Sequence, residues 1–111
     1  ITTRYYDPCC GAGIADVISD RTRAILLESP GSLSFEIQDL PAITAVARAR
    51  GITTIIDNTW ATPLRLQPLV LGVDISIQAL TKYVAGHSDL LMGSATATPA
   101  LWPRLKAASY R

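Results

Sequence analysis

The chain has 111 residues, of which 49% are hydrophobic and only 17% are charged, and its formal net charge is +1. The lysines and arginines are scattered along the chain and offer no basic face for nucleic acid, and the apolar runs are far shorter than the ~20 residues of a membrane span. The length suits one small domain, and the sparse charge indicates that a partner or further polypeptide covers part of its surface.

The first residues, Ile-Thr-Thr-Arg, lack an initiator Met and the layout of a signal peptide. We therefore expect part of a longer protein. Its charge and short apolar runs predict that it binds neither nucleic acid nor membrane, and its two adjacent cysteines fit a reducing cytoplasm. Cys9 and Cys10 are adjacent and cannot join distant segments, and the single histidine supplies no metal-ligand cluster. The sequence predicts no metal site and no reactive thiol.

Residues 23–28 form an apolar run that ends in Glu28, which predicts a buried strand. Asp39 and an early proline then open a helix of about three turns that Gly51 closes. Residues 53–57 are a β-branched run ending in Asp57. Strand, helix and strand in this order form a parallel crossover, which brings Glu28 and Asp57 to the sheet edge where ligands bind.

Residues 72–78 alternate between apolar and polar side chains, which predicts a third strand leading to Thr81 and Lys82. A further strand is expected over residues 90–98, followed by a helix that starts at Pro99 and runs through Ser109. No repeat or linker divides the chain.

Lys82 is a candidate for Schiff-base chemistry with an aldehyde cofactor, because a deprotonated lysine amine condenses with a carbonyl. Asp57 is the matching acid, since a carboxylate can keep a pyridine nitrogen protonated. Thr81 offers a hydroxyl and a backbone N–H to a phosphate. On spacing alone, however, a turn-capping Asp57 and a solvated Lys82 are the simpler interpretation.

Other polar and aromatic residues carry weaker signals. His87 is more simply a structural hydrogen-bonding residue than a proton-transfer group. Its neighbours Ser88 and Asp89 are too close in sequence to form a nucleophilic triad with it. For Glu28 and Trp60, structural roles at a strand end and in the core are favoured over ligand contacts.

Several motifs together resemble the Cys/Met-metabolism family of pyridoxal phosphate (PLP) enzymes, and within it the bacterial cystathionine β-lyase branch. They are Glu28-Ser29-Pro30-Gly31-Ser32, Asp57-Asn58-Thr59-Trp60-Ala61, Ser76-Ile77-Gln78-Ala79 and Thr81-Lys82-Tyr83 continuing to Asp89. The resemblance implies a fold-type I large domain, a three-layer α/β sandwich with a mostly parallel sheet. Residues 1–111 would be its central portion, without an internal boundary.

The same resemblance implies that Lys82 holds PLP as a Schiff base, that Asp57 pairs with the ring nitrogen and that Thr81 contacts the phosphate. Trp60 and Ala79 stand where several members have Phe and Ser, which favours the β-lyase branch and removes one phosphate ligand. Gly31-Ser32 replaces an Asn-Pro pair of many relatives, so ring contacts from that loop are not carried over.

The implied activity is that of a carbon–sulfur β-lyase that cleaves L-cystathionine to homocysteine, pyruvate and ammonia in methionine biosynthesis and transsulfuration. Lys82 would also act as the general base. A cystathionine γ-synthase or γ-lyase of the same family is the alternative, and a non-catalytic structural module is another. The family further implies a homotetramer, a dimer of dimers, with the remaining cofactor and substrate contacts elsewhere, so the isolated piece is expected to be inactive.

Overall fold

The computed structural model describes residues 1–110. It contains short helices, one longer helix and four strands, which in chain order are η1 (Gly11–Asp16), β1 (Ala24–Glu28), α1 (Leu40–Ala49), β2 (Thr53–Asp57), α2 (Thr62–Arg65), β3 (Ile75–Ala79), β4 (Gly93–Ala97) and α3 (Trp102–Ser109).

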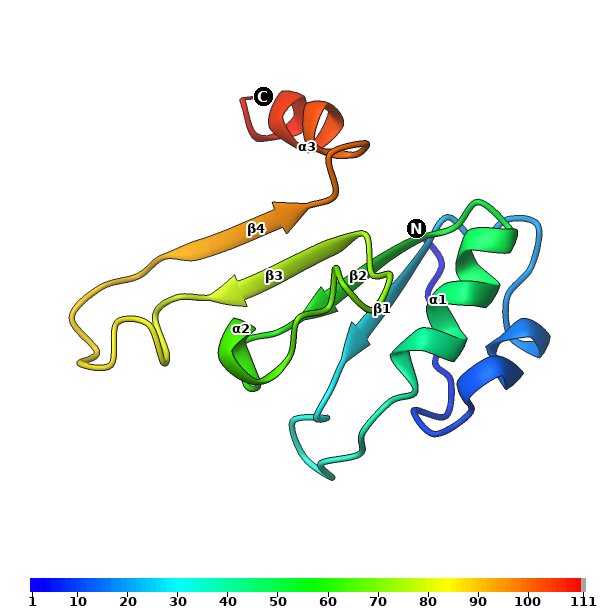
Figure 1. Ribbon diagram of the computed structural model, residues 1–111, viewed down its shortest axis with the longest axis horizontal. Coiled ribbons are helices and arrows are strands. Elements are labelled where there is room, and N and C mark those ends of the chain that lie inside the picture. The colour runs from blue at the N-terminus through cyan, green and yellow to red at the C-terminus, as the bar shows by residue number, and fades with distance from the viewer. Residues whose placement is uncertain (111) are drawn as a thin grey trace.

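The strands form a single sheet in the order β1-β2-β3-β4 (Figure 1). The first three are parallel and β4 is antiparallel to β3. In this register Glu28 lies beside Asp57, and Asp57 lies beside Ile77. The predicted α/β fold with a mostly parallel sheet is confirmed, and so is the crossover that brings two acids to one edge.

Helix α1 has the start and end that the sequence predicts. The Asp39 carboxylate accepts a hydrogen bond from the Ala42 N–H at 3.1 Å, which satisfies one of the free amide groups of the first turn. Pro41 occupies the first turn, where its missing N–H costs nothing. Gly51 has φ +64, and the following Ile52 N–H bonds back to the Ala47 carbonyl at 2.9 Å.

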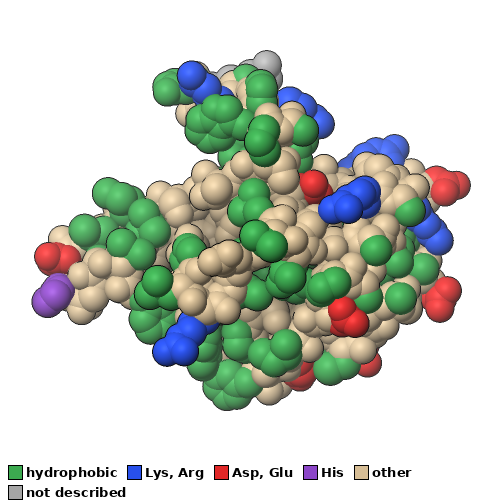
Figure 2. All heavy atoms as spheres, in the orientation of Figure 1, with side chains coloured by type: hydrophobic (Ala, Val, Ile, Leu, Met, Phe, Trp, Pro, Cys, Tyr) green, Lys and Arg blue, Asp and Glu red, His purple; other side chains and the backbone are tan. Residues whose placement is uncertain are grey.

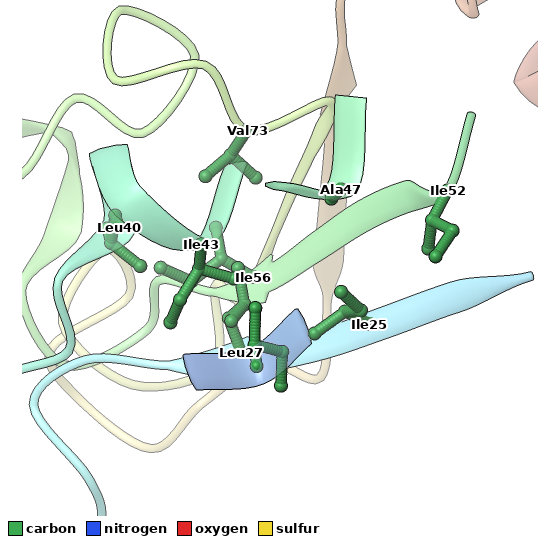
Figure 3. Close-up of a cluster of buried hydrophobic side chains, with 9 residues drawn as sticks. Ile25, Leu27, Leu40, Ile43, Ala47, Ile52, Ile56 and Val73 are labelled. Atoms are coloured by element: carbon green, nitrogen blue, oxygen red, sulfur yellow. The ribbon is translucent and has the colours of Figure 1, made fainter. Parts of the chain in front are cut away.

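The core lies between α1, η1 and one face of the sheet (Figure 3). Alternate residues of β1 and β2 point into it, and α1 covers them with its apolar stripe. Its members are Ile14, Ile25, Leu27, Leu40, Ile43, Ala47, Ile52, Ile56 and Val73. On the opposite face of β1, Leu26 is 66% exposed. Residues 1–110 thus supply the sheet and a helical layer over one face.

The last helix begins later than the sequence predicts. The N–H groups of Leu101 and Trp102 both bond to the Thr98 carbonyl at 3.0 Å and close a turn over residues 99–101, but Pro103 has no N–H to make the next bond, to the Pro99 carbonyl. Helix α3 starts at Trp102, and Pro103 is the proline in its first turn. Both prolines suit a helix start, and the missing N–H of Pro103 interrupts the hydrogen-bond ladder, so that the regular helix begins only at Trp102. The start predicted at Pro99 is wrong.

Gly72 connects the loop before β3 to α1 at close range. Its φ of +92 lies in the region that favours glycine, and a Cβ there would meet Arg48 Nη2 at 2.8 Å and Thr44 Oγ1 at 3.0 Å. Thr44 is buried and its hydroxyl donates to the Leu71 carbonyl at 3.0 Å, so it has little room to move away.

No helix among residues 1–110 is both long and apolar enough to cross a membrane.

Replacing Gly72 by Ala is therefore expected to destabilise the fold more than replacing Gly51. A Cβ on Gly51 meets nothing within 4 Å, so Gly51→Ala adds only the strain of its positive φ, about 1 kcal/mol. Gly72→Ala adds a steric clash of about 1–3 kcal/mol to the same strain. Urea unfolding of the complete polypeptide would compare the two free energies, and equal losses would contradict the close packing at Gly72.

Candidate active site

A cavity of about 520 Å³ lies at the carboxyl edge of the parallel strands. Its lining comes from the last residue of β1 and from the loops that follow β2 and β3, and consists of Glu28, Thr59, Trp60, Lys82, Tyr83 and Gly86. In open α/β sheets, ligands bind at this edge. The cavity also falls within the size range of small-molecule sites, which is roughly 300–1,000 Å³.

Asp57 is the last residue of β2 and is half-buried. Its Oδ1 accepts a hydrogen bond from the Thr59 N–H at 2.9 Å, which fixes the orientation of the carboxylate. Because Ile56 is buried and side chains alternate along a strand, Asp57 points to the face away from α1. Glu28 lies beside it in register and points the same way.

Lys82 projects from the turn that follows β3. The Lys82 N–H donates to the Ala79 carbonyl at 3.1 Å, and the Lys82 carbonyl accepts from the Gly86 N–H at 2.8 Å. Lys82 lines the cavity but is exposed, so residues 1–110 do not bury its amine. The structure therefore places Lys82 and the loop that follows Asp57 around one cavity.

Thr81 directs both of its predicted phosphate donors to Met92. Its hydroxyl donates to the Met92 carbonyl at 3.1 Å, and its backbone N–H donates to the same carbonyl at 3.2 Å. The Met92 N–H in turn donates to the Thr81 hydroxyl at 3.2 Å. These bonds close the base of the loop over residues 82–91, and phosphate binding by Thr81 remains a prediction.

Glu28 ends β1 as expected and also lines the cavity. The segment after it is held by Gln38, whose side-chain Nε2 donates to the Glu28 carbonyl at 2.9 Å and whose backbone N–H donates to Ser29 Oγ at 3.0 Å. The Tyr6 hydroxyl donates to Gln38 Oε1 at 2.9 Å. The N-terminal segment therefore helps to fix the β1 side of the site.

Trp60 does not fill the core. Its side chain is 45% exposed and lines the cavity. It packs edge-on against Phe35, with ring centroids 4.9 Å apart and an interplanar angle of 72°. The core role that the sequence favoured is wrong, because the loop after β2 turns toward the open end of the sheet instead of the α1 side.

The remaining polar candidates do not form a second site. His87 is exposed, and its Nδ1 lies 3.0 Å from the Ala85 carbonyl, which agrees with a structural role. Burial raises the pKa of the Cys10 thiol and the neighbouring Asp7 carboxylate raises it further, which disfavours the reactive thiolate. Within residues 1–110, no three His, Cys, Asp or Glu side chains gather in a way that could hold a metal ion.

Comparison with known protein families identifies the family to which this chain belongs. Residues 1–109 match the family described as Cys/Met metabolism PLP-dependent enzyme. The chain belongs to this family.

A Saccharomyces cerevisiae protein provisionally named a cystathionine beta-lyase is 51% identical over 106 residues, covering 96% of this chain and 31% of the relative. The cystathionine beta-lyase of Escherichia coli is 41% identical over 112 residues, covering 99% and 28%. A crystal structure of cystathionine gamma-lyase from Lactobacillus plantarum complexed with L-serine superposes with a TM-score of 0.82 at 39% identity, covering 86% of this chain and 26% of that one. This chain spans less than a third of each of these proteins.

The residues around the cavity fit the PLP that this family uses. The described chain offers an exposed amine for the aldehyde, on Lys82, and an oriented carboxylate for a protonated ring nitrogen, on Asp57. The cavity between their loops is open and has aromatic side chains in its lining. These residues would hold the aldehyde and ring-nitrogen ends of the cofactor.

Sequence patterns missed Thr59 and Tyr83 as cavity-lining residues. Both lie inside the motifs that resemble the PLP family, but their exposure to the cavity depends on how the loops after β2 and β3 turn. A threonine two positions after a strand-terminal aspartate is a common turn residue, so its position alone carried no functional signal.

We expect Tyr6→Phe to reduce the alkaline sensitivity of folding. Burial raises the pKa of Tyr6 above its ordinary value, although the hydrogen bond to Gln38 opposes this effect. The stabilisation from such a group is complete below the unfolded pKa of about 10 and is lost as the pH rises through the higher folded pKa.

The free energy of unfolding of the complete polypeptide, measured at about pH 8 and about pH 11, should fall less in Tyr6→Phe than in the unmodified protein. Tyr5→Phe is the matched control, because the Tyr5 side chain is 91% exposed. Identical pH dependence in all three proteins would contradict the burial of the Tyr6 hydroxyl.

Proposed function

We propose that this chain is the central portion of the PLP-binding large domain of a longer carbon–sulfur β-lyase, which cleaves L-cystathionine to homocysteine, pyruvate and ammonia. The cofactor role is supported by the cavity, which Lys82 and Thr59 line, and by the Thr59 N–H, which holds the neighbouring Asp57 carboxylate. The β-lyase assignment is supported by relatives named cystathionine beta-lyase at 51% and 41% identity over nearly the whole chain.

Each residue has a distinct task in this proposal. The bound cofactor supplies an electron sink for negative charge at the substrate α-carbon. Lys82 would anchor the cofactor through its amine, and the same amine, when free, would take the α-proton of the substrate. Asp57 holds a proton at the ring nitrogen, with its carboxylate kept in place by the Thr59 N–H.

Trp60 lines the cavity on the side of the loop after β2, and Phe35, from the segment between β1 and α1, packs against it. Their edge-to-face contact gives the wall an apolar, rigid surface. We propose that this wall helps to select the β-lyase reaction, because Trp60 is one of the two positions at which this chain differs from several members of the family. Thr81 remains a proposed phosphate ligand, which must exchange its Met92 partner to act as one.

The second candidate is a γ-lyase or γ-synthase, and the observation that supports this alternative is the structural match to a cystathionine gamma-lyase. The two reactions leave different keto acids from cystathionine. The complete polypeptide, loaded with PLP, is expected to release mainly pyruvate, as measured by separating the products after incubation with L-cystathionine. Dominant 2-oxobutyrate would replace the β-lyase assignment by the γ-lyase alternative.

The two lysines of the chain provide a matched pair for the catalytic proposal. Lys82→Ala should lower kcat by about 10²- to 10⁴-fold, because it removes both the anchor and the base. Lys106→Ala, on α3 and outside the cavity, should leave kcat unchanged. Steady-state kinetics on the complete polypeptide measure both variants, and equal rates would show that Lys82 has no catalytic role.

A non-catalytic module remains the alternative of another class, and turnover by the complete polypeptide would exclude it.

We further propose that the complete protein is a cytoplasmic homotetramer, a dimer of dimers. The exposed apolar side chains of this chain, among them Leu26, Leu64 and Leu91, are available for burial by the remaining polypeptide or by other subunits. Figure 2 shows that hydrophobic side chains are spread over much of one face of the molecule.

A further inference from the structure

Thr59 makes one hydrogen bond to Asp57 and another to Ala79, the last residue of the strand that leads to Lys82. Its backbone N–H donates to Asp57 Oδ1 at 2.9 Å, and its side-chain Oγ1 accepts from the Ala79 N–H at 2.8 Å. The residue is half-buried and lines the same cavity as Lys82. A single residue therefore joins the end of β2 to the end of β3.

The bond to Ala79 continues the β2–β3 ladder beyond its last backbone pair. The Asn58 N–H donates to the Ile77 carbonyl at 2.8 Å, so the Asn58 carbonyl would be the next acceptor for the Ala79 N–H. That carbonyl instead accepts from the Thr62 N–H at 3.0 Å, where α2 begins. Thr59 Oγ1 takes its place, and the chain enters α2 without leaving the Ala79 amide unpaired.

Ala79 is also the first residue of the turn that presents Lys82. Its carbonyl accepts from the Lys82 N–H at 3.1 Å, so both backbone groups of Ala79 are committed, one to Thr59 and one to Lys82. A shift of Ala79 would therefore move the start of the lysine turn. Ala79, which the Thr59 hydroxyl holds, lies only three positions before Lys82 in the chain.

We propose that Thr59 is a positioning residue that fixes the Asp57 carboxylate relative to the Lys82 turn, an inference that rests on the cofactor roles proposed above for these two residues. The N–H holds one carboxylate oxygen, and the hydroxyl holds the strand from which the lysine emerges. The two groups must act on opposite ends of one small molecule, so their relative placement limits the rate. The role is the same for a β-lyase and for a γ-lyase.

The test uses three variants of the complete polypeptide loaded with PLP. Thr59→Val removes the hydroxyl but keeps the branched shape and the backbone N–H, and Thr59→Ser keeps the hydroxyl. Thr53→Val is the control, because Thr53 is half-buried at the opposite end of β2. The readouts are kcat, KM, the thermal unfolding temperature and the pH at which the visible absorbance of the bound cofactor changes.

Thr59→Val should lower kcat by about ten- to a hundredfold, change KM less and shift the pH midpoint of the visible absorbance. Thr59→Ser and Thr53→Val should behave like the unmodified protein. A normal kcat and pH midpoint in Thr59→Val would overturn the proposal, and so would equal impairment of Thr59→Val and Thr59→Ser. If Thr59→Val does not fold, Thr59→Ala takes its place, and failure of both to fold would assign Thr59 to folding instead.

Lys82→Ala distinguishes this proposal from the function on which it rests. If Lys82→Ala keeps the visible absorbance, the cofactor role of Lys82 is wrong and the positioning role of Thr59 falls with it. If Lys82→Ala loses the absorbance while Thr59→Val is normal, the proposed function stands and only the role of Thr59 is overturned.

Discussion

Parallel pairing of β1, β2 and β3 is the constraint on which the candidate site depends. It brings the carboxyl ends of three strands to one edge, with Glu28 on one side of Asp57 and the end of β3 on the other. Helix α1 makes this pairing possible by crossing over the sheet, and its buried side chains hold β1 and β2 against it. The hydrogen bonds of Thr59 then connect the ends of β2 and β3. The positions of Asp57 and Lys82 are thus consequences of the sheet and its loops.

The sequence predicted the elements that have strong local signals. Helix α1 has a capping aspartate, an early proline and a terminal glycine, and β2 is a β-branched run; the structure confirms both. The start of α3 was missed because Pro99 and Pro103 both suit a helix start on local grounds, and the regular helix begins only at Trp102 because Pro103 cannot donate to the Pro99 carbonyl. The parallel arrangement was predictable because a strand, a helix and a strand of these lengths allow few topologies.

The site was predictable in part, for similar reasons. Residues at strand ends follow from the topology, so Glu28 and Asp57 were placed correctly at one edge. Contacts between loops do not follow from it, which is why the cavity-facing position of Trp60 and the bond from Ala79 to Thr59 appear only in three dimensions. The match over residues 1–109 shows that the chain belongs to a family of PLP-dependent enzymes, and PLP is therefore the cofactor against which this geometry is interpreted.

The central claim is that Lys82, presented at the carboxyl edge of the sheet, is the residue that carries the cofactor. Borohydride reduction of the complete, PLP-loaded polypeptide, followed by proteolysis and mass spectrometry, identifies the lysine that carries the cofactor. The account predicts the pyridoxyl mass on the peptide that contains Lys82. Finding it on the peptide that contains Lys106, on a lysine elsewhere in the polypeptide, or on none, would contradict it.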